Sequence, residues 1–267
     1  MIAGTVMGSS HNFIAIEINK QSVSLQQLLR FAKWSSESRF IRNAVDTVLI
    51  RQAALEATIE VTDEEVQQGA DSFRAKRDLY DEKRTNRWLA RHFLSQAEWE
   101  ATLEDEIMRL KLRDFLTAGR VERYFAEHSL SFDTATISRI VVKDENVAKE
   151  LRAQIVEDDA DFYALARKYS IDLLTRPAGG YSGLVRRTEM EPRMEAAIFG
   201  TQPGKTVGPI KTYAGWELVK LEAIHLATLD DSLRETIKSL LFEDWLAGER
   251  VKAKISFPLF EYAQSGL

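Results

Sequence analysis

Residues 177–215 read PAGGYSGLVRRTEMEPRMEAAIFGTQPGKTVGPIKTYAG, and this stretch decides the fold class. It holds four of the five prolines and seven of the thirteen glycines in the 267-residue chain, whereas the first 176 residues contain no proline. Proline interrupts helices and strands, and glycine permits the backbone conformations of tight turns. The sequence therefore predicts two architectures in one chain: a helical part and a small part of mixed strands and helices.

The sequence on either side of this stretch supports a mixed part of strands and short helices. Residues 135–142, ATISRIVV, alternate in polarity and are rich in β-branched side chains, which predicts a strand. The apolar spacing after them predicts helices ending near residue 155 and spanning 160–168, then a loop over 171–183. A short helix at 194–199 and strands at 206–210 and 216–221 complete this part.

Amphipathic patterns predict helices on both sides of the mixed part. Before it they lie at 39–57, 63–75, 95–117 and 121–127, preceded by a strand at 13–18. Thr62 and Ser95 each stand three residues before a glutamate, the signature of a capping box. A last helix over 230–251 carries an apolar face that needs a partner surface, and the helical part is the expected one.

The predicted fold class is therefore α+β, an all-helical N-terminal domain completed by a C-terminal helix, plus a small mixed domain. The predicted boundaries are 1–132, 133–225 and 226–267.

Composition excludes several classes of protein. The chain is 45% hydrophobic and 29% charged, with no run of about 18 apolar residues, so no membrane span is expected. Cysteine is absent, and the four histidines lack the paired spacing of metal ligands, so neither a metal nor a cofactor is expected. The net charge of -5 is spread evenly, which argues against a nucleic-acid partner. The first residues do not resemble a secretory signal, which predicts a cytoplasmic protein, or an extracytoplasmic one if a signal was trimmed.

The mixed part resembles the parvulin (PpiC/rotamase) family of peptidyl-prolyl isomerases. The matching blocks occur in family order at close to family spacing: ISRIVVKDE, DFYALARKYSID, the glycine pair 179–180, EMEPRMEAAIF, QPGK, GPIKT and AGWELVKLE. Helices on both sides of such a domain are similar to the SurA/PrsA architecture of bacterial foldases and chaperones. The resemblance implies a parvulin-like fold and an unfolded or extended polypeptide as the partner.

Three positions carry what the resemblance implies for catalysis. The family's acid position is Asp172, while its two histidine positions are occupied by Arg139 and Glu217. The resemblance therefore predicts weak or lost isomerase activity. Because a guanidinium and a carboxylate on neighbouring strands can form a bidentate pair, we expect an Arg139–Glu217 salt bridge with Asp172 nearby.

The family's proline pocket is partly kept. Met190 and Phe199 match family residues, Met194 stands where an aromatic residue is usual, and Ser182 stands where an apolar one is usual. Tyr181 occupies the place of a common aspartate. The implied substrate-binding residues are these five, and methionine still accepts an apolar side chain.

Two further functions stay open at this level, an active peptidyl-prolyl isomerase and an accessory factor in peptide maturation or export. The apolar face of the last helix also leaves a homodimer open. A basic run is interpreted either as a solvated helix face or as a contact for an acidic partner. Its members are Arg74, Lys76, Arg77, Lys83, Arg84, Arg87 and Arg91, offset by Asp78, Asp81 and Glu82.

Overall fold

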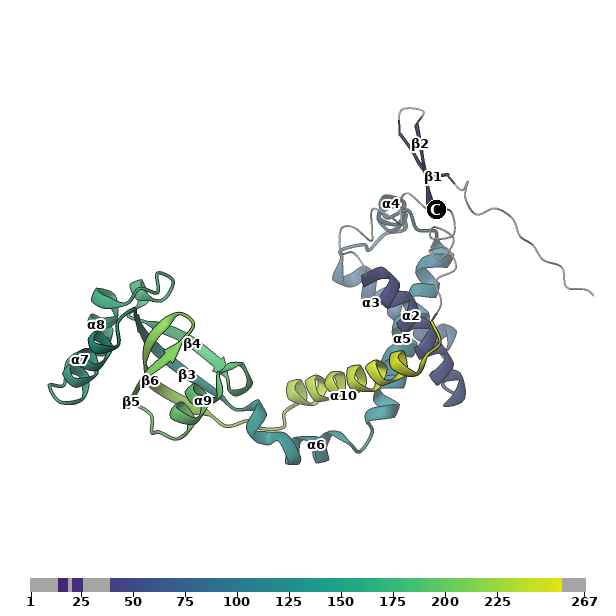
Figure 1. Cartoon of the computed structure of the whole chain (residues 1–267). Coiled ribbons are helices and arrows are strands. Elements are labelled where there is room, and N and C mark those ends of the chain that lie inside the picture. The colour runs from purple at the N-terminus through teal and green to yellow at the C-terminus, as the bar shows by residue number, and fades with distance from the viewer. Residues whose placement is uncertain (1–13, 19–20, 26–38, 256–267) are drawn as a thin grey trace, which may run out of the picture. The chain divides into compact units, whose positions relative to one another are not determined.

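The computed structural model describes residues 14–18, 21–25 and 39–255 (Figure 1). Contacts between residues divide the chain into two units, one made of Met1–Ala118 and Lys238–Leu267, the other of Gly119–Ile237. The boundaries at residues 132 and 225 stay predictions about where the domains separate. The α+β class is confirmed, since one unit is helical and the other is a small antiparallel sheet with helices.

The helical unit begins with a two-stranded antiparallel sheet and continues as helices. Its described elements are β1 (Ile14–Ile18), β2 (Gln21–Ser24), α2 (Arg39–Glu56), α3 (Asp63–Lys76), α4 (Glu82–Arg91), α5 (Gln96–Thr117) and the part of α10 (Asp231–Lys252) from residue 238 on.

Capping boxes start two of these helices. The Thr62 hydroxyl accepts from the amide of Glu65, whose carboxylate accepts from the amide of Thr62. Ser95 and Glu98 make the same reciprocal pair at the start of α5. Each box satisfies two amides that a helix start leaves without partners. Both predicted boxes are confirmed.

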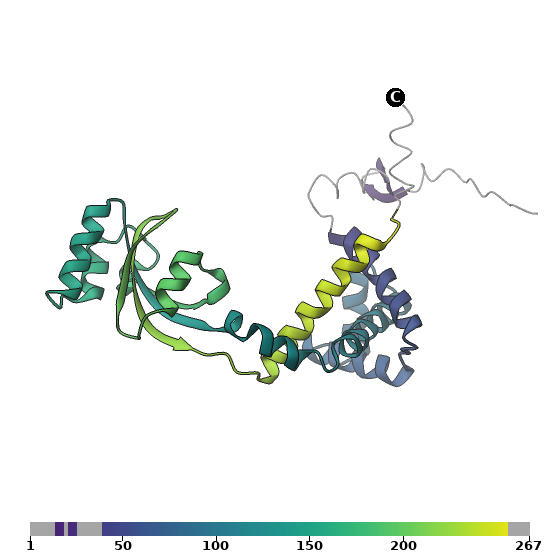
Figure 2. The same cartoon turned by 60° about the horizontal axis from the view of Figure 1, so that its bottom comes forward.

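Two buried clusters hold the helical unit together. Ala70, Leu89, Trp99 and Leu103 join α3, α4 and α5. A second cluster of Ile50, Leu112, Phe242 and Leu246 places α10 against α2 and α5, as Figure 2 shows for the yellow end of α10. From Phe242 on, the C-terminal helix thus packs its apolar side chains against the helical unit.

Helix α4 has no counterpart among the helices predicted from the sequence. It starts at Asp81, whose side chain accepts from the amide of Arg84. Its sequence, EKRTNRWLAR, contains only three apolar residues, Trp88, Leu89 and Ala90, and they are consecutive, so their spacing does not reveal a helix.

The second unit is a four-stranded antiparallel sheet with helices on both faces (Figure 1). Its strand order is β4-β3-β6-β5. The elements are α6 (Val121–His128), η2 (Ser129–Phe132), β3 (Thr134–Val142), α7 (Glu145–Val156), α8 (Phe162–Tyr169), η3 (Arg176–Ala178), β4 (Tyr181–Arg186), η4 (Arg187–Glu189), α9 (Pro192–Phe199), β5 (Thr206–Thr212), β6 (Gly215–His225) and the first turns of α10.

Strand β4 corrects the prediction of a loop extending to residue 183. Tyr181 already pairs with Ser138 of β3, and the pairing continues to Arg186 opposite Thr134. Gly183 and Ser182 give this segment a turn-like composition, but the hydrogen bonds of β3 hold it as an edge strand.

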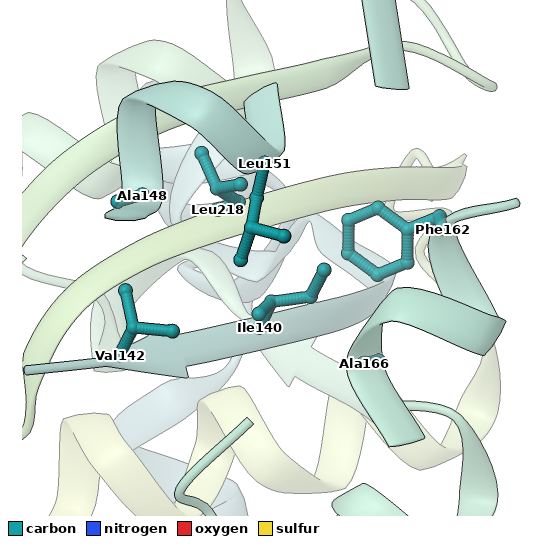
Figure 3. Close-up of a cluster of buried hydrophobic side chains, with 7 residues drawn as sticks. All are labelled: Ile140, Val142, Ala148, Leu151, Phe162, Ala166 and Leu218. Carbon is teal, nitrogen blue, oxygen red and sulfur yellow. The ribbon is translucent and has the colours of Figure 1, made fainter. Parts of the chain in front are cut away.

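Alternate residues of the two central strands build two separate cores. On one face Ile140, Val142 and Leu218 pack with Leu151 of α7 and Phe162 of α8, as Figure 3 shows. The other face packs against α9. Its cluster is Ala135, Ile137, Met194, Ile198, Val219 and Leu221.

Candidate functional site

The register of β3 and β6 places two charged residues on the α9 face of the sheet. Arg139 lies directly opposite Val219, a member of the cluster beneath α9. Glu217 lies two residues before Val219 on the same strand, opposite Val141. Because directly opposed residues and residues two apart share one face of a sheet, Arg139 and Glu217 belong to the α9 face.

Asp172 is brought to this sheet by the segment that follows α8. The buried Ser170 hydroxyl accepts from the amide of Val141, and the amide of Ile171 donates to the carbonyl oxygen of Val141 at 2.8 Å. These two bonds fasten the segment alongside β3 just before Asp172. The side chain of Asp172 is consequently held against the sheet rather than in a free loop.

Arg139 and Asp172 form an ion pair. Nε and Nη2 of Arg139 donate to Oδ2 of Asp172 at 3.0 and 2.7 Å. The side chains are 32% and 13% exposed, so the pair is only partly shielded from water. Two donors from one guanidinium fix its orientation as well as its position.

Gly180 allows the close approach that sets the backbone of Arg139. The amide of Arg139 donates to the Gly180 carbonyl oxygen at 2.8 Å. Gly180 has φ +84, and a Cβ atom there would lie 2.3 Å from the carbonyl oxygen of Arg139. Only glycine fits this position without moving one of the two backbones.

The environment of Asp172 favours its charged form. Burial acts to raise its pKa, but hydrogen bonds from Thr175, Arg139 and the amide of Leu174 outweigh this effect, so the pKa of Asp172 lies below its ordinary value. Together with the guanidinium, the carboxylate makes an ionic centre.

The expected salt bridge between Arg139 and Glu217 does not form. Glu217 is 5% exposed, and its Oε1 accepts from the hydroxyl of Thr212 at 2.7 Å. The guanidinium of Arg139 turns to Asp172 instead. The cross-strand prediction was wrong because the segment after α8 supplies a competing carboxylate whose position only the folded chain defines.

The residues of the implied proline pocket lie in or beside the α9 cluster. Met194 belongs to the cluster, and Met190 and Phe199 are partly buried against it. Ser182 is partly buried and donates to the Gly180 carbonyl oxygen at 3.1 Å. Tyr181, at the start of β4, is 53% exposed. The structure thus groups the two methionines and the phenylalanine, and places Ser182 and Tyr181 on the edge strand.

Three contributors to this site were missed from the sequence. Thr175 and Thr212 donate to the carboxylates of Asp172 and Glu217. The spacing of Thr175, three residues after an aspartate in a turn, is a signal that could have found it. The guanidinium carbon of Arg187 lies 4.5 Å from the centre of the Phe199 ring, and no local sequence pattern indicates that contact.

The described part of the chain holds no group of three or more histidine, aspartate or glutamate residues that could bind a metal ion. Among its helices, none combines the length and apolar character needed to cross a membrane.

Comparison with known proteins identifies the domain that carries this site. Residues 124–223 match the family model of the rotamase, or PPIC-type PPIASE, domain. The chain carries a parvulin-type rotamase domain. This domain contains the sheet, α9 and every residue of the ionic centre described above.

The similarity extends beyond the rotamase domain. Foldase protein PrsA of Caldanaerobacter subterraneus subsp. tengcongensis is 30% identical over 197 residues, which cover 73% of this chain and 60% of that protein. Chaperone SurA of Bordetella avium is 36% identical over 105 residues, covering 36% of this chain and 21% of that one. The chain thus spans about three fifths of the length of the PrsA relative.

A solved structure supports the architecture. The crystal structure of peptidylprolyl isomerase (PrsA) from Bacillus anthracis superposes with a TM-score of 0.51 at 20% identity, covering 82% of this chain and all of that one. At this identity the likeness concerns the fold alone. A helical unit combined with a rotamase domain is therefore the PrsA/SurA type of architecture.

Proposed function

We propose that this protein is a chaperone of the foldase type that binds extended or unfolded polypeptide and whose isomerase activity is weak or lost. The rotamase domain and the similarity to a foldase and a chaperone support the polypeptide-binding part. The ion pair between Arg139 and Asp172 is the observation that supports weak or lost isomerase activity.

Prolyl isomerisation needs a site of a particular shape and electric field. The barrier of about 18–20 kcal/mol comes from amide resonance, and an enzyme lowers it by favouring the twisted amide. Here the guanidinium is committed to Asp172 and the carboxyl of Glu217 to Thr212. These groups replace the neutral imidazoles that the family resemblance implies, and a fixed ionic pair gives the twisted amide a different field.

The surface beside the ionic centre suits an apolar polypeptide segment. Leu173 and Leu174 directly follow Asp172 and are 68% and 89% exposed. Tyr181 directly follows Gly180, which touches the backbone of Arg139. Exposed apolar side chains gathered near one site are typical of a binding surface.

A protease-coupled assay on a proline tetrapeptide tests the activity. We expect the full chain to give rates close to those of buffer, and the double variant Arg139→His, Glu217→His to give a higher rate. A fast wild-type chain contradicts the loss of activity. A double variant as slow as the wild type contradicts the assignment of these two positions.

Delay of client aggregation tests the binding. We expect the double variant Leu173→Ser, Leu174→Ser to delay aggregation of an unfolded protein less than the wild type does. Tyr213→Ser is the matched control, since Tyr213 is 96% exposed on the turn between β5 and β6. A wild-type chain that neither delays aggregation nor binds peptide contradicts the proposal.

One observation favours the alternative of an active isomerase. Arg139 uses Nε and Nη2 on Asp172, and no partner is recorded for its Nη1 among the described residues. A donor at that atom would stabilise the prolyl nitrogen when amide resonance is broken. Under this alternative Arg139→Lys loses most of the activity, because lysine lacks the second donor in a fixed geometry. A role as an accessory factor in peptide maturation or export remains a third proposal, tested by whether a precursor peptide binds in preference to unfolded proteins.

A further inference from the structure

The end of α3, the turn after it and α4 concentrate positive charge on a chain that is acidic as a whole. Residues 74–91 hold seven basic and three acidic side chains, whereas the net charge of the chain is -5. This concentration lies in the helical unit, outside the rotamase domain.

Most of these cations are not neutralised within the part of the chain that the structure describes. Arg74 pairs with Asp71 at 2.9 Å and Arg84 with Asp81 at 3.2 Å. No carboxylate partner is recorded among the described residues for the other five: Lys76, Arg77, Lys83, Arg87 and Arg91. The helix surface therefore presents free charge.

Three of the arginines surround a small groove. It measures about 220 Å³ and is lined by Leu79, Arg84, Arg87, Trp88 and Arg91. Leu79 is buried and Trp88 half-buried, so they form an apolar base beneath the guanidinium groups.

Aromatic contacts hold the indole of Trp88 in place. The Phe73 ring meets it edge-on at 5.0 Å, and the His92 ring stacks on it at 3.9 Å. Nδ1 of His92 also lies 2.8 Å from the Trp88 carbonyl oxygen. The base of the groove is thus preorganised before any ligand arrives, which lowers the cost of ordering on binding.

We propose that this groove, the arginine groove, binds an acidic segment of an extended client polypeptide that carries two carboxylates two residues apart. The proposal rests on the proposed polypeptide-binding function and names the chemistry of one class of client segment. Guanidinium groups bind carboxylates through paired hydrogen bonds, so arginine suits this role better than lysine.

The spacing of the two arginines of the groove that have no carboxylate partner recorded among the described residues matches such a segment. Arg87 and Arg91 lie four residues apart on α4, which separates them by about 6 Å along the helix axis. In an extended chain, side chains two residues apart lie on one side and are separated by about 6.6 Å. Two acidic side chains with one residue between them therefore meet both guanidinium groups at once.

The surrounding charge favours a short acidic segment over a continuous anionic surface. Asp78, Asp81 and Glu82 interrupt the basic residues along this stretch, so the positive charge is not continuous enough to follow a phosphate chain or an anionic bilayer. The free arginines of the groove also cover little more than one helical turn, too short a track for a nucleic-acid backbone.

Fluorescence anisotropy with the full chain tests the proposal. The probes are the rhodamine-labelled peptide Ser-Thr-Glu-Val-Glu-Thr-Ser and its twin with glutamine at both glutamate positions. We expect the glutamate peptide to bind at least about tenfold more tightly, and to weaken as salt is added.

Matched charge variants separate the groove from the general field of the helix pair. Arg87→Glu with Arg91→Glu should weaken binding by about tenfold or more, whereas Lys76→Glu with Lys83→Glu, an equal change in charge outside the groove, should weaken it less than about threefold. Arg87→Gln with Arg91→Gln serves as a second variant if the charge reversal unfolds the unit.

Three results would overturn the arginine groove as a carboxylate site. The first is equal binding of the two peptides, and the second is equal weakening of binding by the two pairs of charge variants. The third is displacement of the labelled peptide by phosphatidylglycerol vesicles, or by a single-stranded oligonucleotide, at a lower concentration of negative charge than the unlabelled glutamate peptide requires. The same variants should still delay aggregation of a client without acidic pairs. If they do while the peptide result fails, the proposed chaperone function stands and only this inference falls.

Discussion

Replacing Gly180 by alanine tests the contact that fixes Arg139 in the rotamase domain. Any L-residue at φ +84 incurs about 1–2 kcal/mol of backbone strain. The added Cβ would in addition lie 2.3 Å from the Arg139 carbonyl oxygen, a backbone atom that moves only if β3 moves. Separating the two segments also sacrifices the hydrogen bond from the Arg139 amide, worth about 1 kcal/mol. The total destabilisation is about 3 kcal/mol or more.

Gly183→Ala is the matched control. Gly183 has φ +74, so alanine meets a similar backbone strain, but nothing lies within 4 Å of its added Cβ. We expect this variant to lose only the strain energy, about 1–2 kcal/mol. The difference between the two variants therefore isolates the close approach of Gly180 to β3.

Hydrogen exchange of the β3 amides measures both losses in the full chain. Because about 1.4 kcal/mol corresponds to a factor of ten in an opening equilibrium, Gly180→Ala should exchange at least about tenfold faster than Gly183→Ala. Equal exchange in the two variants would refute the packing of Gly180 against Arg139.

Three further predictions concern the charged and polar groups. Asp172→Asn should lower the free energy of unfolding by about 1–2 kcal/mol at pH 7, because the pair is partly exposed. The folded-state pKa of Asp172 is lowered, so this contribution is present above pH about 4 and is lost as the pH falls through the folded-state pKa. The unfolding curves of the wild type and the variant should therefore converge in acid. Arg250→Met should cost about 3 kcal/mol, because it leaves the buried Asp46 carboxylate without the guanidinium that donates at 2.6 and 2.8 Å; a thermal midpoint of the helical unit equal to the wild type would contradict this. Thr212→Val should destabilise the rotamase domain by about 1–3 kcal/mol by removing the hydrogen bond to buried Glu217, and unchanged exchange of the β6 amides would show otherwise.

Much of the fold was predictable because its signals are local. A capping box needs only a serine or threonine and a glutamate three residues later, and Thr62 and Ser95 both start helices as predicted. The alternation of ATISRIVV likewise predicted β3. Features without such signals were missed. The three apolar residues of α4 are consecutive, so their spacing does not indicate a helix, and β4 is a strand because β3 pairs with it.

The candidate site divides in the same way. The family resemblance indicated Arg139, Asp172 and Glu217 as its positions, but the predicted pairing of Arg139 with Glu217 was wrong. That prediction considered only residues on neighbouring strands. It did not include the segment after α8, whose hydrogen bonds to Val141 bring the carboxylate of Asp172 within reach of Arg139.

The sequence by itself determined which segments form helices and turns, and which residue types occupy the family's positions. These properties depend on neighbours within a few residues, whose spacing the sequence states directly. Only the tertiary structure decided which carboxylate Arg139 binds, because Asp172 lies 33 residues away along the chain and reaches it through the pairing of another segment with β3. The arginine groove is a similar case: a basic run is visible in the sequence, but the packing of α4 on α3 placed Trp88 and Leu79 beneath the guanidinium groups.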